Sequence, residues 1–562
     1  MSVLPRRARR AMVAGAAGSL LATCLLATTA TAEPSHAGGN GRPTDGVLYR
    51  QSFDDLADRL QPRAEEPGIE AGTTGFTHEA PEDWSVENGT QMAEGGIQEW
   101  EGWSFTTRDF WTDAEDQMRG RFARAHDVIA VADSDEFADA PDAPERFDST
   151  LVSAPVDVRG RHEVALTFDS HYRGWEGQSA TVTVELDGSG QETELLRYDS
   201  GTVTDNYDGA HINASENLAV EIPNGTRSAT FRWHFESTAN SWYWAIDSVA
   251  VHEALDEPRG GATSAWVVSD IQGDPDDLGH ALRDLAAVRP DAAGLLTVGD
   301  QVASGTPAQW QEIDDVMTAA AGVLPEQLVT AIGNHESYTG EPWPVLRDRF
   351  LDFAGRDKVW GEYVLEGDGV DVPVLVLGQE EARPPEVPMS REQIEWFGDR
   401  LDHWTQQRKQ VLVISHFPLG DTVSASWIPW YSDHYQYNDE LTQILGDHPN
   451  AVILTGHTHY PFELGDWAVQ RRTDGGHPDG FWAVNTGAVQ VEWDARGEHT
   501  DGISEIVTRD INRGLTVDVY RDRMVVTGRD FGVVTGDQPT NTVNDVVREV
   551  TIPNPYVHSP RG

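Results

Sequence analysis

The sequence predicts a multidomain protein in which an all-β sandwich is followed by an α/β domain. Short strands with period-2 alternation fill residues 47–253, whereas buried-type strands alternate with helical stretches from residue 263 onward. At 562 residues the chain also exceeds the usual size of a single domain. We therefore expect two separate hydrophobic cores.

The N-terminal domain is assigned to residues 47–253. Its clearest alternating runs are HEVALTFDSHY, SATVTVELDG, SATFRWHFES and YWAIDSVAVHE. The stretches FDSHYR and NSWYWAIDSVAV resemble strands of jelly-roll modules in secreted carbohydrate-active and adhesion proteins, which implies a jelly-roll-like accessory domain. A flexible leader is expected at residues 33–46 and a linker at residues 254–262.

The C-terminal domain is assigned to residues 263–535, with a C-terminal extension at 536–562. Its near-continuous apolar strands indicate a sheet covered on both faces: AWVVSD, AGLLTVGD, LVTAIGNH, PVLVLGQ, QVLVISH and AVILTGH. Helices are predicted to begin after Thr306, in a capping box with Gln309, and after Ser390. The runs LTVDVY and RMVVTGRDF are expected to form a hairpin that completes the domain.

Residues 1–32 are predicted to be a cleavable signal peptide. Arginines cluster between positions 6 and 10, an apolar stretch follows, and Ala30-Thr31-Ala32 offers a cleavage site. Secretion is therefore expected, by the Sec or the twin-arginine route, and the alternative is an uncleaved membrane anchor. Cys24, the only cysteine, lies in this segment, so the mature chain should lack disulfides and thiolate metal sites. No later run approaches the ~20 apolar residues of a membrane span, so no transmembrane segment is expected after cleavage.

The acidic composition restricts the partners. The sequence has 41 Lys and Arg residues against 93 Asp and Glu residues, a formal net charge of −52 at pH 7. A field of this sign disfavours nucleic acids and anionic membranes as partners. A phosphate-bearing ligand would need a local, positively charged binding site.

Metal-competent residues follow successive strands of the α/β domain. Open α/β sheets bind ligands at the carboxyl ends of their strands, so these residues are expected to converge. Singly, each has an ordinary explanation, such as a turn aspartate or a hydrogen-bonded histidine. The ordered set favours one site. It comprises Asp270, Asp300, Asn334, His335, His416, His457 and His459.

The donor types point to a pair of metal ions. Carboxylate, amide and imidazole ligands suit Mn, Zn or Fe rather than a soft thiolate site. A carboxylate can use both oxygens to bridge two ions, as in two-metal hydrolytic sites. Glycines before Asp300, Asn334 and His457 allow the backbone to turn sharply and to approach closely at these strand ends.

The ordered motifs D-x-Q, GD, GNHE, H and GHTH resemble those of the calcineurin-like metallophosphoesterase superfamily, over about residues 264–531. The resemblance implies a four-layer αββα domain and a hydrolase of phosphate mono- or diesters. It also implies two divalent ions, of Mn, Zn, Fe or Mg, and in-line attack on phosphorus by a metal-bridging hydroxide. Within the superfamily the chain is similar to a secreted bacterial branch.

The resemblance also implies individual roles. His335 would lie beside the phosphate and stabilise or protonate the leaving oxygen, with Glu336 as its orienting partner. The implied ligands of the first ion are Asp270, Gln272, Asp300 and His459. The implied ligands of the second ion are Asp300, Asn334, His416 and His457.

Two positions depart from the family pattern. Gln272 stands where relatives most often have histidine, so we expect a weaker first site that prefers a harder ion such as Mn or Mg over Zn. Ala303 stands where many relatives place Asp, Asn or a metal-binding tyrosine. The missing tyrosine argues against a purple Fe(III) chromophore.

The aromatic segment at residues 424–439 has two interpretations. It forms either a wall over the metals, with side chains that stack on the substrate, or a local minicore under a long loop. The side chains in question are Trp427, Trp430, Tyr431 and His434.

The sandwich also carries candidate binding residues. Its tryptophans either line a glycan groove or belong to the core; the candidates are Trp175, Trp242 and Trp244. A structural Ca2+ is a further hypothesis, with Asp133, Asp135 and Asp247 as its ligands.

The leading hypothesis is therefore a secreted metal-dependent phosphoesterase with an accessory sandwich that targets or braces it. The alternative is a cell-surface or glycan-binding protein, on cell walls or extracellular glycans, whose phosphoesterase domain is catalytically weakened. A nuclease is a third hypothesis, which the negative charge disfavours.

Overall fold

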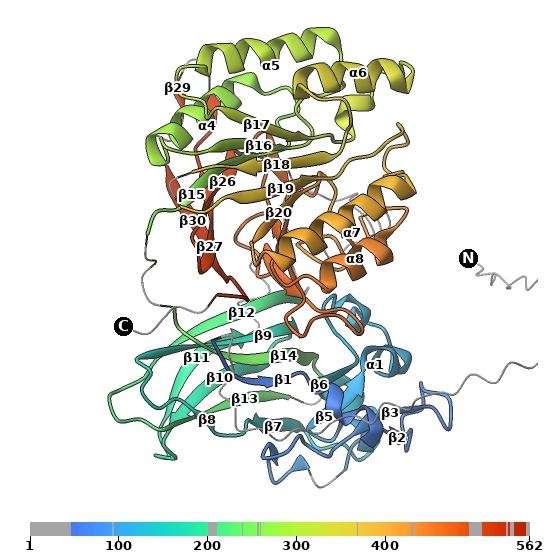
Figure 1. Cartoon of the computed structure of the whole chain (residues 1–562). Helices are drawn as coiled ribbons and strands as arrows, with labels where there is room; N and C mark the ends of the chain where they lie inside the picture. Colours follow the sequence, from blue (N-terminus) through green and yellow to red (C-terminus); the bar gives the residue numbers. More distant parts are fainter. Residues whose placement is uncertain are drawn as a thin grey trace, which may run out of the picture. The chain divides into compact units, whose positions relative to one another are not determined.

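The protein is described here by a computed structural model (Figure 1). The predicted signal peptide and almost all of the predicted leader lie outside the described residues, as does the end of the predicted C-terminal extension. The described residues are 46–557 without 93–94, 200–210, 239, 256–257, 259, 368, 429–430, 433, 494–507, 536–537 and 540–543.

The N-terminal region consists of two antiparallel sheets. The eight-stranded sheet has the order β12-β9-β14-β6-β5-β3-β2, with β1 paired to β14, and the six-stranded sheet has the order β11-β10-β13-β7-β4, with β8 paired to β13. The first sheet contains β1 (Val47–Gln51), β2 (Gln61–Pro62), β3 (Thr74–Thr77), β5 (Trp103–Thr107), β6 (Val128–Asp133), β9 (Glu163–Arg173), β12 (His211–Glu221) and β14 (Tyr243–Glu253). The second contains β4 (Ser85–Asn88), β7 (Arg146–Val152), β8 (Val156–Asp157), β10 (Ser179–Leu186), β11 (Glu192–Asp199) and β13 (Ser228–Thr238). Short helices connect them: η1 (Asp54–Arg59), η3 (Gln98–Trp100), α1 (Arg108–Ala114), η4 (Arg119–Arg121) and α2 (Ser134–Phe137).

Alternation along the strands builds the core of this region. In β13, alternate residues from Ala229 to Phe235 are buried while their neighbours are partly exposed. Trp233 pairs with Val182 of β10, and its ring stacks on that of Trp84 at 5.6 Å between centroids. The four alternating sequence runs correspond to β9, β10, β13 and β14, so the prediction of an N-terminal β-rich domain is confirmed.

The C-terminal region contains two six-stranded mixed sheets, in the orders β17-β16-β15-β26-β27-β30 and β18-β19-β20-β21-β23-β22. The first contains β15 (Thr263–Val268), β16 (Gly294–Val298), β17 (Gln327–Ala331), β26 (Arg513–Val519), β27 (Arg523–Asp530) and β30 (Asp545–Pro553). The second contains β18 (Gly361–Leu365), β19 (Val372–Val376), β20 (Val411–Ile414), β21 (Ala451–Thr455), β22 (Ala468–Arg471) and β23 (Phe481–Asn485). Two small hairpin-like pairs accompany them: β24 (Val491–Trp493) with β25 (Thr508–Asp510), and β28 (Val534–Thr535) with β29 (Gln538–Pro539).

Two helices of this region begin where the sequence predicts caps. Thr306 and Gln309 form both bonds of a capping box, and the Ser390 side chain accepts from the Gln393 backbone N–H. The helices are α4 (Pro275–Val288), α5 (Pro307–Ala320), η5 (His335–Ser337), α6 (Trp343–Ala354), α7 (Arg391–Gln406) and α8 (Asn438–Gly446).

Strand alternation also explains the layers of the C-terminal region. In β15, Val267 packs in the core between the two sheets, whereas its neighbours Trp266 and Val268 pack with Leu282 of α4. In the second sheet, Leu412 points into the inter-sheet core and Val413 packs with Phe397 of α7. The order helices, sheet, sheet, helices confirms the predicted αββα fold (Figure 1).

One assignment at the C-terminus needs correction. Residues 545–553, placed in an extension outside the domain, form β30, which pairs antiparallel with β27 at the edge of the first sheet. Because β30 pairs with one neighbouring strand only, β27, most of its side chains stay at least partly exposed and its sequence lacks a continuous apolar run.

Among the described residues, no helix has the length and apolar character needed to cross a membrane.

Candidate metal centre

The predicted ligands lie at the ends of parallel strands. β15, β16 and β17 are parallel to one another, and so are β19, β20, β21 and β23. Asp270 and Asp300 come two residues after β15 and β16, and His416 and His457 come two residues after β20 and β21. The carboxyl ends of both sheets therefore contribute to one place.

The backbone at these strand ends is left-handed. Positive φ angles occur at Asp270 (51°), Gln272 (44°), Asp300 (53°), His457 (70°) and His459 (56°). Such residues store of order 1–3 kcal/mol of strain each and cluster at functional sites. The left-handed backbone at these positions gives the side chains directions that differ from those of a regular strand.

The glycines before three of the ligands allow close approach. A Cβ at Gly299 would lie 2.4 Å from the His416 ring, one at Gly333 2.1 Å from Asp300 Oδ1, and one at Gly456 2.3 Å from Asp270 Oδ2. The prediction that these glycines serve close backbone approach is confirmed.

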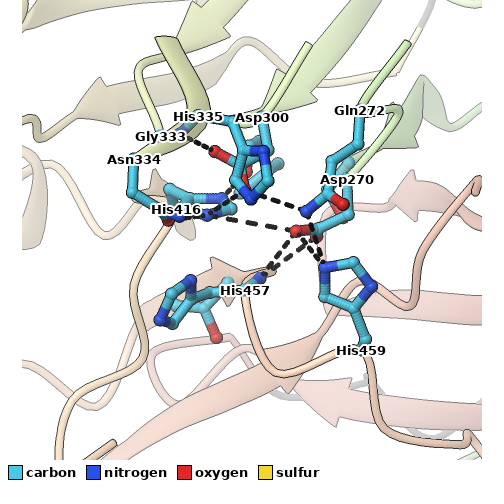
Figure 2. A network of polar contacts seen from close by, with 12 residues as sticks. Asp270, Gln272, Asp300, Gly333, Asn334, His335, His416, His457 and His459 are labelled. Atoms are coloured by element: carbon cyan, nitrogen blue, oxygen red, sulfur yellow. Dashed lines mark hydrogen bonds and ion pairs between the residues drawn. The ribbon is translucent and has the colours of Figure 1, made fainter. Parts of the chain in front are cut away.

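Asp300 lies at the centre of the site (Figure 2). Its Oδ2 is 3.1 Å from His416 Nε2 and accepts from Gln272 Nε2 at 3.2 Å, while its Oδ1 accepts from the backbone N–H of His335 at 2.9 Å. The side chain is fully buried. Both carboxylate oxygens thus face different neighbours.

The remaining predicted ligands surround this carboxylate. His459 Nε2 lies 3.0 Å from Asp270 Oδ1 and 3.1 Å from Gln272 Nε2. Asn334 Oδ1 lies 3.0 Å from His416 Nε2. Ligand atoms of Asp300, His416 and His457 all lie within 4.8 Å of one another. All seven predicted ligands therefore come together.

The site's electrostatics are those of a cation-binding centre. Burial opposes ionisation of Asp300, but His416 holds the pKa of this carboxyl well below its usual range. Burial disfavours the His416 imidazolium, yet Asp300 and Asp270 raise its pKa to about 9. Burial and neighbouring imidazoles lower the pKa of His457 well below its ordinary value. Carboxylates, amides and imidazoles without a thiolate fit divalent Mn, Zn, Fe or Mg.

Gln272 lies inside this group, as expected. Its side-chain amide reaches the other ligands, and either the nitrogen or the oxygen of that amide can face them. The amide nitrogen contacts both Asp300 and His459. Rotation of the amide by 180° would turn its oxygen to the same point. The position thus offers one weak neutral donor where an imidazole would offer a stronger one.

His335 reaches the site as expected, but Glu336 does not orient its ring. His335 Nδ1 donates to the Ala303 carbonyl at 2.8 Å, and its Nε2 lies 3.8 Å from Asp300 Oδ2. The Glu336 carboxylate instead accepts from backbone N–H groups, of Gln301 and Gly333 at 2.7 Å each and of Asp300 at 3.2 Å. Burial raises the pKa of Glu336 to about 8. Its place is under the loops that carry the ligands, rather than beside the substrate.

Two residues at the site were not assigned roles from the sequence. Tyr338 hydroxyl accepts from Asn334 Nδ2 at 2.6 Å, and its ring lies 4.6 Å from that of His335. Trp493 stacks on His459 at 4.7 Å and 10°. The i, i+4 spacing of Asn334 and Tyr338 was the one available signal for the tyrosine.

The aromatic segment at residues 424–439 contributes both to a hydrophobic core and to the border of the metal site. Trp427 and Tyr431 belong to the hydrophobic core cluster of the sandwich, as the minicore reading implies. The Tyr431 ring also lies 5.4 Å from that of His457, so this residue borders the site. His434 contacts His457 directly. Trp430 lies outside the described residues.

The tryptophans proposed for a glycan groove separate by burial. Trp244 is fully buried and its indole N–H donates to Ser170, so it belongs to the core. Trp175 is 54% exposed and meets the ring of Trp242 edge-on at 6.3 Å.

Only two of the three proposed calcium ligands, Asp133 and Asp135, lie together. Arg119 binds Asp133 at 2.8 Å and Asp135 at 3.2 Å, all with buried or nearly buried side chains. Asp247 pairs instead with Arg472 at 3.1 Å. Arg119 therefore supplies positive charge to Asp133 and Asp135, and Arg472 supplies it to Asp247, where the sequence suggested Ca2+.

Comparison with known proteins gives one family. The model of the calcineurin-like phosphoesterases matches residues 263–461. No curated protein matches the chain. Every predicted ligand, from Asp270 to His459, falls within the matched residues.

Several solved structures are similar. A dimetal phosphatase from Danio rerio shares 15% identity at a TM-score of 0.37, over 52% of this chain and 99% of that chain. The purple acid phosphatase PPD1 from yellow lupin (Lupinus luteus) seeds shares 13% at a TM-score of 0.37, over 74% and 81%. GAP50 of Plasmodium shares 11% at a TM-score of 0.34, over 52% and 89%. Likeness of this degree carries no functional inference.

The family match and the gathered strand-end donors concern the same part of the chain, residues 263–461. The family hydrolyses phosphoric esters with divalent ions, and its match spans the whole set of donors described above. The chain therefore contains a calcineurin-like phosphoesterase domain and is a hydrolase of phosphoric ester bonds.

Proposed function

We propose that this protein is a secreted phosphoesterase that uses two divalent ions to hydrolyse phosphate mono- or diesters. The carrying observation is the buried Asp300 carboxylate, whose two oxygens face groups from different strand ends. A carboxylate in this position can bridge two ions. Secretion rests on the predicted signal peptide.

The donors divide into two sets that share this bridge. The first set comprises Asp270, Gln272, Asp300 and His459, and the second Asp300, Asn334, His416 and His457. Ions bound there would supply Lewis acidity toward phosphoryl oxygens and toward water. The acidic chain needs no basic surface for its substrate, because the ions provide a local positive field.

His335 is the proposed proton donor to the leaving oxygen. Its Nδ1 is held by the Ala303 carbonyl, which leaves Nε2 beside the bridging carboxylate. The side chain is 25% exposed, so a bound ester can reach it. The neighbouring Tyr338 ring, with the residue 46% exposed, offers apolar surface to the alcohol part of the ester.

The experiment is hydrolysis of an aryl phosphate monoester and an aryl phosphate diester by metal-stripped protein, before and after Mn2+ is supplied. We expect turnover only with metal, and its loss in Asp300→Asn. Asp314→Asn, an exposed change on α5, is the matched control and should keep full activity. Metal-independent turnover, or full activity in Asp300→Asn, would refute the proposal.

Gln272 suggests which ion is preferred. An amide is a weaker ligand for Zn than an imidazole, so the wild type should favour Mn or Mg at the first position. We predict that Gln272→His raises the affinity for Zn relative to Mn by about tenfold. Competition titrations with the two ions measure the ratio, and Gln311→His on the exposed face of α5 is the control. Two tightly held zinc ions in the wild type would contradict this preference.

A second, accessory role is proposed for the sandwich, namely glycan binding. It rests on the exposed face of Trp175 beside Trp242. Trp175→Ala should abolish retention on cell-wall or extracellular polysaccharides and leave ester hydrolysis unchanged. Equal retention of the variant would end this proposal.

A further inference from the structure

Two of the three imidazole ligands are oriented by the backbone. His416 Nδ1 donates to the Val298 carbonyl at 2.9 Å, and His459 Nδ1 donates to the Val491 carbonyl at 2.7 Å. A carbonyl oxygen only accepts, so in both rings Nδ1 carries the proton and Nε2 is free for an ion. The Nε2 atoms indeed face the carboxylates of the site.

The third imidazole is tied in the opposite sense. The Nε2 atom of His457 lies 3.2 Å from Nε2 of His434. Its backbone N–H donates to both oxygens of Asp270, at 3.2 and 3.1 Å, and a ligand atom of His457 lies within 4.8 Å of those of Asp300 and His416. Because Nε2 of His457 contacts a second imidazole, Nδ1 is the ring nitrogen left for the second ion.

His434 is itself fixed. The residue is 4% exposed, and its carbonyl accepts from the Val387 backbone N–H at 2.7 Å. Its ring lies edge-on to Phe417 and Tyr431, at 5.8 and 5.9 Å between centroids. Packing against these two rings restricts rotation of the His434 imidazole, which keeps its Nε2 within reach of His457.

We propose that His434 is a positioning residue for the second metal ion. Its Nε2 accepts a hydrogen bond from His457 Nε2–H, which fixes the tautomer that presents Nδ1 and holds the ring in place. This inference rests on the proposed two-ion function, because it assigns His457 to the second ion. The partner of His457 is a side chain, whereas the partners of His416 and His459 are main-chain carbonyls. A substitution of His434 can therefore remove this partner without changing a ligand.

The loss of such an orienting partner typically lowers metal affinity by about 10–100-fold. We expect this loss for His434→Phe, which keeps a planar ring against Phe417 and Tyr431 but cannot accept a hydrogen bond from His457. His434→Gln should recover most of the affinity, because its amide oxygen can accept from His457 Nε2. His434→Asn is too short to reach and should behave as the phenylalanine variant does.

The experiment is calorimetric titration of metal-stripped wild type and variants with Mn2+. The binding step of the second ion, which should be the tighter step because Gln272 weakens the first site, should shift in His434→Phe and His434→Asn, while the step of the first ion stays within twofold. His448→Gln is the control, because His448 is also buried but bonds to Ile444 and Asp402 away from the site. The melting temperature of each metal-free variant shows whether it folds, and His434→Asn decides the question if the phenylalanine variant does not.

X-ray absorption of the Co2+-loaded proteins separates positioning from ligation. Positioning predicts the same number of imidazole nitrogens per ion in the saturated wild type and His434→Asn. One nitrogen fewer in the variant would make His434 a direct ligand and overturn the proposal, as would unchanged affinity in both the phenylalanine and asparagine variants. A wild type that binds fewer than two ions would instead refute the two-ion function.

Discussion

Asn334 is held by contacts at both ends of its amide. Its Oδ1 lies against His416 Nε2 and its Nδ2 donates to the hydroxyl of Tyr338. The tyrosine thereby keeps the amide oxygen on the side of the proposed second ion. A neutral oxygen donor depends on such orientation more than a carboxylate does, because only one of its two terminal atoms can bind a cation.

We predict that Tyr338→Phe weakens the second ion. The lost hydrogen bond contributes about 1 kcal/mol, which corresponds to roughly fivefold in the dissociation constant. Mn2+ titration of the metal-stripped protein measures it. Tyr363→Phe, on β18, is the matched control, since its hydroxyl accepts from the Arg356 guanidinium at 3.4 Å and from none of the proposed ligands. Equal affinities in wild type and Tyr338→Phe would contradict the assigned role.

At the scale of the elements, the turns after the strands are as specific as the side chains they carry. The turn after β17 brings Gly333 against Asp300, and the Glu336 carboxylate joins the backbones of this turn and of the turn after β16. Two neighbouring strand ends are thus locked together by one buried acid. The ligands on these ends cannot shift independently.

Gly333→Ala tests this lock. The added Cβ would meet the backbone nitrogen of Asp300 at 2.5 Å as well as its carboxylate, so one strand end must move. We expect loss of metal binding and a fall in stability of about 2 kcal/mol, which denaturant titration would detect. Gly322→Ala, where a Cβ meets nothing within 4 Å, should change neither. Full metal binding by Gly333→Ala would show that the turn tolerates displacement.

The buried acids around α2 predict a pH dependence of the sandwich. Burial, with Asp133 close by, raises the pKa of Glu136 to about 9 despite Arg119. In the unfolded chain this carboxyl ionises at about 4.5, so between these values the folded state holds the extra proton. Stability carried by the protonated form is complete below the unfolded pKa and is lost as pH rises through the folded pKa.

We therefore expect Glu136→Gln to lose less stability than the wild type as pH rises from 5 to 9. Thermal unfolding at several pH values measures the difference in Tm, which should grow in favour of the variant. Glu312→Gln, on the exposed face of α5, should run parallel to the wild type. Parallel curves for Glu136→Gln would mean that Glu136 is ionised in the folded protein.

At the scale of the whole described chain, the sandwich and the phosphoesterase domain share one hydrophobic cluster. Trp427 donates to Asp466 at 3.2 Å, packs on His211 of β12 at 5.0 Å and lies under the Arg121 guanidinium. Farther along the chain, Arg472 binds Asp54 at 2.7 Å and Asp247 at 3.1 Å. Side chains of the sandwich therefore contact the phosphoesterase domain at two places, Trp427 and Arg472.

Trp427→Ala should destabilise both parts at once. Truncation of a buried tryptophan costs about 3–5 kcal/mol, and here the cavity would open in a cluster to which both domains contribute. Scanning calorimetry should show lower melting for the sandwich and for the phosphoesterase domain. Trp175→Ala, at an exposed tryptophan, is the control. A change confined to one transition would show that the domains fold independently.

The strand-end ligands could be predicted from the sequence because each follows an apolar run and a turn. Asp300 and His457 each sit behind a glycine after such a run, and chain order alone placed them at one sheet edge. The partners could not be predicted in this way. Ala303 serves through its carbonyl, which leaves no trace in residue type, and Glu336 turned out to bind backbone N–H groups across a distance in sequence. β30 was missed because an edge strand needs no continuous apolar pattern.

The left-handed residues of the metal centre have a consequence for ion exchange. Backbone N–H groups of His335 and His457 donate to the carboxylates of Asp300 and Asp270, and Gly333 and Gly456 lie against the same two side chains. The conformational entropy of ordering these loops is therefore lost when the chain folds rather than when a metal binds. Ions should enter and leave a rigid scaffold, and the free energy of each binding event should go into coordination instead of loop ordering.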